Sequence, residues 1–175
     1  MSDSSTLGDA LAAELERAET KLEEAHDEHQ ALQTEFETLK PDIREVATHP
    51  VAGEHEDEDP LDVLTDQYMQ YRQKALDAER LRHQILQIHV QRNRVAKSVS
   101  GPAGALSFNL DFLEDRPELL DRAEHLTVQF ERRRRTVWKV FYETLEQIDA
   151  LATDCRDEYI DEAVSLYEQI RELQH

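Results

Sequence analysis

The fold is decided by residues 11–46, which read LAAELERAETKLEEAHDEHQALQTEFETLKPDIREV. Apolar residues recur in this stretch at alternating steps of four and three over about five heptads, which is the spacing of a coiled-coil seam. The one polar seam position, His29, is expected to set the register inside the coil, or else to serve as a metal ligand or pH sensor. The seam residues are Leu11, Leu15, Ala18, Leu22, Ala25, His29, Leu32, Phe36, Leu39, Ile43 and Val46.

Glycine and proline divide the rest of the chain. All of them except Gly8 fall within 41–60 or 101–117, and the stretches between are rich in strong helix formers. Pro41 is expected either to kink the first helix or to begin a fresh turn. We therefore predict an all-α fold, an elongated antiparallel three-helix coiled-coil bundle forming one domain over 1–175. The helices are expected at about 5–48, 60–99 and 117–174, joined by an acidic loop at 49–60 and a Gly/Pro-bounded loop at 100–116.

The second helix has two apolar strips, and the added strip (Leu76, Leu86 and Val90) predicts that it contacts two neighbours as the middle helix. Antiparallel pairing through short connections then matches residue numbers summing to about 109 for the first pair and about 216 for the second. This register places the arginines near the end of the middle helix opposite the glutamates of the first.

The same register leaves the chain beyond about residue 155 as a C-terminal helical overhang. Its apolar face is too broad for an ordinary solvated surface, which favours a protein partner or a second copy of the chain. The expected partner-binding residues are Tyr159, Ile160, Val164, Leu166, Tyr167, Ile170 and Leu173.

Charge and composition indicate the environment of the protein. The 175 residues include 39 acidic and 20 basic side chains, a formal net charge of −19. Because molar salt screens carboxylate repulsion, this composition predicts a halophilic, archaeal, cytoplasmic protein, with an ordinary acidic coiled coil as the alternative. No membrane association is expected, because there is neither a secretory leader nor an apolar run of about 20 residues. Cys155 lies on a helical apolar stripe and is expected to be a buried, inert thiol.

Two segments offer alternative interactions. The basic run Arg132, Arg133, Arg134 and Arg135 precedes Trp138 and Tyr142, a combination that can bind nucleic acid. In so acidic a chain, a salt-bridge cluster against the first helix is the preferred interpretation, so nucleic acid is an unlikely partner. The other segment alternates apolar and polar residues and is expected to cap the bundle or to dock on a partner's sheet edge. Its apolar residues are Leu106, Phe108, Leu110 and Phe112.

Metal and catalytic sites are poorly supported. Glu23 and His26 form one Glu-x-x-His motif, half of a di-metal bundle site, and a metal-binding bundle is kept as a distant alternative. The acidic loop lacks the ligand spacing of a calcium loop. No phosphate loop, nucleophile elbow or zinc motif is present. We therefore predict a non-catalytic coiled-coil scaffold or interaction protein without cofactors.

Overall fold

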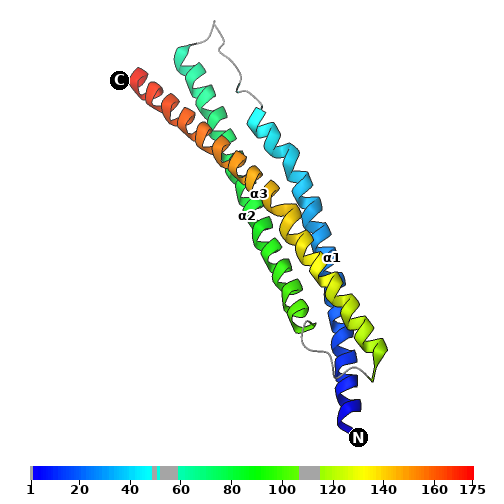
Figure 1. Ribbon diagram of the computed structural model, residues 1–175. Coiled ribbons are helices and arrows are strands. Elements are labelled where there is room, and N and C mark those ends of the chain that lie inside the picture. Colours follow the sequence, from blue (N-terminus) through cyan, green and yellow to red (C-terminus); the bar gives the residue numbers. More distant parts are fainter. Residues whose placement is uncertain (1, 49–50, 52–58, 107–114) are drawn as a thin grey trace. The chain divides into compact units, whose positions relative to one another are not determined.

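The computed structural model describes residues 2–48, 51, 59–106 and 115–175. It contains three helices, α1 (Ser2–Thr48), α2 (Pro60–Leu106) and α3 (Pro117–Gln174), labelled in Figure 1. They pack against one another, which confirms the predicted all-α bundle of three helices. The seam of α1 is also confirmed, because each of its eleven positions from Leu11 to Val46 is buried or half-buried.

Capping residues account for the two internal helix starts. The Asp59 carboxylate accepts a hydrogen bond from the Leu61 amide at 3.2 Å, and Pro60 occupies the first helical position, which needs no amide donor. Pro117 plays the same part in α3, where the Arg116 carbonyl accepts from the amides of Leu119 and Leu120. Both starts lie where the sequence predicted them.

Two helices run through residues that usually interrupt helices. Pro41 lies inside α1, which continues to Thr48. The expected end of α2 at residue 99 is wrong, since α2 continues through Gly101 and Pro102 to Leu106. The fixed φ of proline suits a helix, and no described glycine adopts the left-handed φ of a helix-terminating cap.

The chain divides into two compact units, and each helix contributes a segment to both. Unit 1 comprises Met1–Thr34 with His89–Glu143, and unit 2 comprises Glu35–Ile88 with Thr144–His175. The expectation of a single domain over 1–175 stays a prediction.

Unit 1 is held by an apolar core and by ion pairs between α1 and α3. Arg122 donates two hydrogen bonds to the Glu19 carboxylate at 2.6 and 2.7 Å, and Arg116 pairs with Asp9 at 3.7 Å. Because these numbers rise together along both helices, α1 and α3 run parallel in this unit. The hydrogen bonds from Arg122 lower the pKa of Glu19. The largest fully buried side chains of the unit are Leu15, Val95, Val99, Phe130 and Val137.

Unit 2 has its own core, in which all three helices meet. Ala75 and Ala78 of α2 pack with Cys155 and Tyr159 of α3, and Val46 of α1 covers them. The Tyr159 hydroxyl donates a hydrogen bond to the Val46 carbonyl, which ties α3 to the end of α1. Burial raises the pKa of the Tyr159 phenol, so it stays a donor at neutral pH.

The register of α2 against α3 in unit 2 differs from the prediction. The contacts Tyr68–Tyr167, Glu79–Arg156 and Arg82–Thr153 join residues whose numbers sum to 235, where about 216 was expected. The helices are antiparallel as predicted, but the C-terminal segment is packed on α2 and is not an unpaired overhang. A heptad pattern fixes which face is buried and leaves the axial offset open. Because α2 ends at Leu106 and not at residue 99, the connection between α2 and α3 begins later in the chain, which raises the sum of facing residue numbers.

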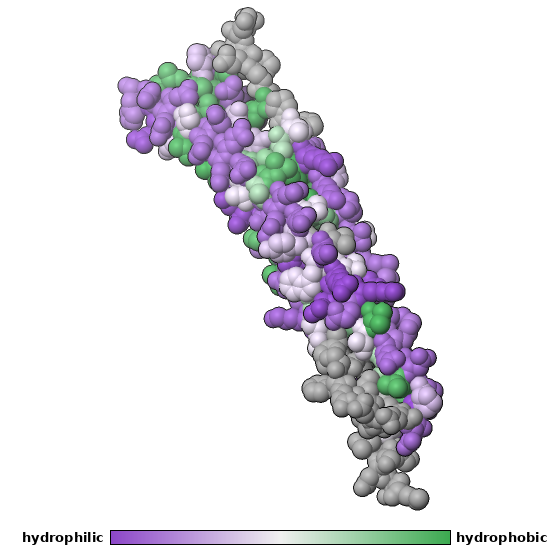
Figure 2. Space-filling view, viewed as in Figure 1, coloured by the Kyte–Doolittle hydropathy of each residue, from purple (hydrophilic) through white to green (hydrophobic). Residues whose placement is uncertain are grey.

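The ion pairs between helices also differ from the expected charge pairing of α1 with α2. In the part of the chain that the structure describes, α1 forms ion pairs with α3 and with Arg116 directly before α3, and α2 forms ion pairs with α3. Asp9 and Glu19 of α1 therefore pair with Arg116 and Arg122, because α1 and the start of α3 lie side by side there. Figure 2 shows hydrophilic residues over most of the described surface on the visible face, with small hydrophobic groups between them.

Candidate functional site

A groove of about 590 Å³ runs between α2 and α3 in unit 2. Its wall on α2 is formed by Tyr68, Arg72, Ala75, Leu76 and Glu79. Its wall on α3 is formed by Arg156, Ile160, Ala163, Val164 and Tyr167. No lining residue comes from α1, so the groove belongs to this helix pair alone.

Helical geometry explains why large apolar side chains remain accessible here. The seam of α3 is buried at Tyr159, Ala163 and Leu166, and the larger apolar groove residues of α3 each lie one position further along, on the flank of that seam. The small residues Ala75 and Ala163 line the groove, and the larger side chains remain exposed beside them. Leu76 is 56% exposed and Val164 is 52% exposed, so each has apolar surface available for contact.

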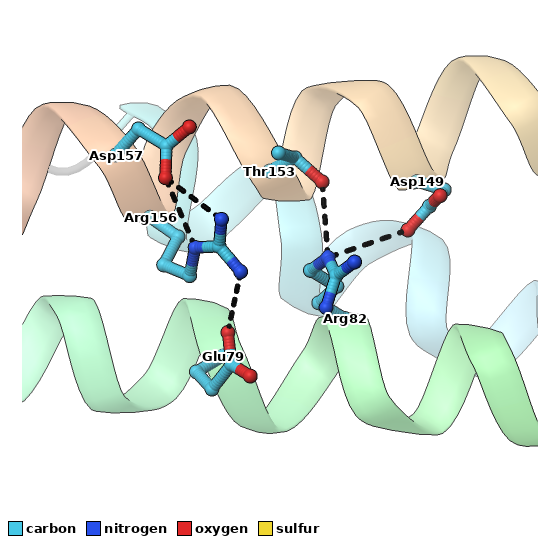
Figure 3. Close-up of polar contacts among 6 residues, drawn as sticks. All are labelled: Glu79, Arg82, Asp149, Thr153, Arg156 and Asp157. Atoms are coloured by element: carbon cyan, nitrogen blue, oxygen red, sulfur yellow. Dashed lines mark hydrogen bonds and ion pairs between the residues drawn. The ribbon is translucent and has the colours of Figure 1, made fainter.

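Polar and aromatic contacts fix the two walls relative to each other. Arg156 of α3 donates to the Glu79 carboxylate of α2 at 3.0 Å and to Asp157 on its own helix (Figure 3). Hydrogen bonds to Asp157 and Glu79 raise the pKa of Arg156, which stays charged. Further along α3, the rings of Tyr68 and Tyr167 lie 6.0 Å apart between centroids. The groove is thus held by contacts within unit 2 and is already formed.

A second arginine reinforces this register from the opposite helix. Arg82 of α2 donates to the Thr153 hydroxyl of α3 at 3.2 Å and lies 4.0 Å from the Asp149 carboxylate (Figure 3). Each helix therefore contributes one arginine that reaches across to the other. Such reciprocal contacts specify one axial offset, which an apolar seam alone does not.

The structure separates the residues predicted to bind a partner. Tyr159, Leu166 and Ile170 are buried within the bundle, so they stabilise the fold. The exposed members are Ile160, Val164, Tyr167 and Leu173, and all except Leu173 line the groove.

The prediction missed the α2 wall of the groove, including Tyr68 and Leu76. A sequence signal for this wall existed in the second apolar strip of α2, which was assigned to a neighbouring helix. That assignment is wrong, because Leu76, Leu86 and Val90 are exposed. Because the predicted axial register was wrong, the prediction did not place Leu76 of this strip beside the C-terminal residues of α3.

The basic run of α3 lies in unit 1, and its arginines have separate environments. Arg132 and Arg135 are exposed and make no ion pair with any described residue, while Arg134 pairs with Glu131 on its own helix at 2.9 Å. Arg133 lines a shallow hollow of about 340 Å³ with acidic and histidine residues of α1. The predicted salt-bridge cluster against the first helix is therefore not formed in the described part of the chain, because the run spans most of the helix circumference.

Arg92 is an unexpected buried cation in unit 1. It is only 4% exposed, and its guanidinium lies 5.5 Å from the Trp138 ring centroid and 5.2 Å from that of Tyr142. Its side chain also donates to Asn93 at 3.0 Å. The α2 seam steps directly from Ile88 to Val95, and position 92 is the heptad position between them. That gap in the apolar pattern was the signal for Arg92.

The histidines of α1 give no metal cluster. His29 is 3% exposed, and burial lowers its pKa, assisted by the nearby charges of Arg133 and His26. Glu23 and His26 line the hollow that also holds Arg133, a cation that repels a metal ion. Within the described residues, no three His, Cys, Asp or Glu side chains are grouped to hold a metal ion. The neutral, buried His29 fits a seam residue.

The remaining predicted segments contribute little to a site. Cys155 is a free cysteine and is buried, and burial raises the pKa of its thiol, which disfavours the nucleophilic thiolate. Leu106 ends α2, whereas Phe108, Leu110 and Phe112 lie outside the described residues, as does most of the acidic loop.

None of the helices, over the residues described, has a stretch long and apolar enough to cross a membrane. Comparisons with protein-family models, curated proteins and solved structures give no match to this chain.

Proposed function

We propose that this protein is a non-catalytic helical interaction protein that engages an amphipathic helix in the α2–α3 groove of unit 2. The observation that carries the proposal is the groove itself, with its exposed apolar walls on a preformed helix pair. The helix engaged belongs either to a second copy or to another protein.

A helix is the occupant that this geometry favours. On α3, Ile160, Val164 and Tyr167 follow steps of four and three, the spacing of a helix that packs its side chains against another helix. Charged residues, including Arg72 and Glu79, line the groove beside the apolar side chains. An apolar centre with polar surroundings is typical of protein interfaces.

Replacing Val164 with aspartate should weaken binding of an amphipathic helix at least about 10-fold, because the carboxylate would lose water on docking. The probe is a fluorescein-labelled 14-residue Leu/Lys amphipathic peptide, followed by fluorescence anisotropy. Binding is measured in about 1 M KCl, where screening suppresses non-specific attraction of a cationic peptide to an acidic chain.

Val128→Asp is the matched control, since Val128 is 49% exposed and lies on α3 in unit 1. It adds the same charge to a similarly exposed valine outside the groove. The control should bind the peptide as the wild type does. Equal weakening by the two variants, or no effect of Val164→Asp, would contradict the proposal.

A second candidate function is single-stranded nucleic-acid binding by unit 1. The observation that favours it is that Arg132 and Arg135 are exposed without ion pairs to described residues, on the same helix as the exposed aromatic residues Trp138 and Tyr142. Aromatic rings can stack on bases while arginines contact phosphates.

If unit 1 binds in this way, the affinity for a labelled single-stranded DNA oligonucleotide should fall with rising salt. Two phosphate contacts give a slope of about −1.4 in log affinity against log salt. The double variant Arg132→Ala/Arg135→Ala should flatten that slope. Absence of binding even at low salt would exclude this second function.

We further propose that the protein is cytoplasmic and adapted to high salt, as in a halophilic archaeon. The net charge of −19 and the preference for arginine over lysine, 15 against 5, support this proposal. Salt at molar concentration reduces the Debye length to about 3 Å and so weakens repulsion among the carboxylates.

A further inference from the structure

We infer that the occupant of the α2–α3 groove is a second copy of this chain, docked so that α2 of each copy packs on α3 of the other. This inference rests on the proposed function of the groove and specifies its partner. Two such helix pairs would form a four-helix bundle around the apolar side chains that each unit 2 leaves exposed.

The charges of the two walls favour this arrangement over the alternatives. In unit 2, the segment of α2 from residue 60 to 88 holds four acidic and four basic residues, whereas α3 from 144 to 174 holds nine acidic and two basic. Packing α3 on α3 would bring two strongly acidic helices together. Packing α2 on α3 places a neutral helix against an acidic one, which is the electrostatically favourable choice.

A two-fold axis parallel to the helices produces this pairing. The two acidic α3 segments then occupy diagonally opposite corners of the four-helix bundle. The rotation leaves the height of each residue along the axis unchanged. The observed register then applies between copies as well, so that residue numbers facing each other sum to about 235. Met69 of one copy would face Tyr167 of the other, and Leu76 would face Ile160, all four of them exposed.

Specific charges on the outer flanks match under this symmetry. Arg72 and Arg80 are exposed on α2, and neither makes an ion pair with a described residue of its own chain. At their levels, α3 of the second copy presents Asp161 and Asp157, both exposed. Because the symmetry repeats each pair, a favourable match is counted twice in the dimer.

Light scattering coupled to size exclusion, in about 0.5 M KCl across a range of concentrations, tests this assembly. The wild type should show twice the chain mass, and Val164→Asp should raise the dimer Kd on the order of 100-fold, since the dimer contains the substitution twice. Val128→Asp should remain a dimer. Circular dichroism of each variant checks that its helices are retained.

Charge reversal tests the pairing itself. Arg72→Asp and Asp161→Arg should each weaken the dimer, and the double variant should restore it, since each copy then supplies the exchanged pair. A monomeric wild type at every concentration, or a double variant no better than the singles, would overturn the inference. If the wild type is monomeric yet the Leu/Lys peptide still binds and Val164→Asp abolishes that binding, the groove keeps its proposed function with another occupant. Loss of both results would overturn both proposals.

Discussion

Replacing Phe130 with alanine should lower the free energy of unfolding by about 3–5 kcal/mol. Phe130 is 0% exposed in the core of unit 1, so truncation leaves a cavity and removes a large apolar contact area. A loss of this size is a large fraction of the total stability of a small domain. The expected result is a shift of the denaturant midpoint to much lower concentration.

Urea unfolding followed by Trp138 fluorescence and by circular dichroism measures this loss. Trp138 is the single tryptophan of the chain and lies in unit 1, so it reports on the unit that contains Phe130. Val128→Ala, at an exposed position of the same helix segment, should change the stability by less than about 0.5 kcal/mol. A similar small effect of Phe130→Ala would contradict the described core.

Raising KCl from about 0.1 M to about 2 M should increase the melting temperature by about 6–12 °C. Screening removes repulsion that the native state concentrates and the unfolded chain relieves, and for a chain of this length about 3 kcal/mol corresponds to roughly 6–12 °C. In unit 2, the acidic surface of α3 is a main source of this repulsion, since two of its charged residues are basic and nine are acidic.

Thermal melts by circular dichroism measure the effect, with two controls. Sucrose at matched osmolarity separates screening from the general strengthening of burial by excluded solutes. The variant Asp161→Asn/Glu168→Gln keeps the size of two exposed side chains and removes their charge, so it should reduce the dependence on salt. Stability that is unchanged or lower in molar KCl would refute adaptation to high salt.

The sequence predicted what depends on local pattern. The heptad seam of α1, the helix starts at Pro60 and Pro117 and the bounds of α3 all follow from periodicity and capping, which act over a few residues. The end of α2 was mispredicted, because Gly101 and Pro102 are compatible with a helix when their backbone is right-handed.

The axial register of α2 against α3 was predicted wrongly, and for that reason the candidate site was not predicted. The offset of α2 against α3 depends on pairs distant in sequence, such as Arg156 with Glu79 and Arg82 with Thr153. In the predicted register, the C-terminal residues of α3 had no contact with α2. The groove wall that includes Tyr68 and Leu76 was therefore not predicted. Exposed residues such as Val164 could be predicted individually, but the groove could not.

The burial of Arg92 could not be predicted for a different reason. An arginine at a seam position interrupts the apolar heptad pattern. Its burial depends on the rings of Trp138 and Tyr142, which lie on another helix. The position could be predicted from the heptad, whereas the aromatic cover could not.

Engagement of a helix in the α2–α3 groove of unit 2 is the proposed function of this chain. The rate of maleimide labelling of a single introduced thiol tests it most directly, because the native thiol of Cys155 is buried and reacts slowly. At a protein concentration low enough for the chain to be monomeric, saturating Leu/Lys peptide in about 1 M KCl should slow labelling of Val164→Cys at least about 10-fold and leave Val128→Cys within about twofold. Equal rates at the two positions, with and without peptide, would contradict the account.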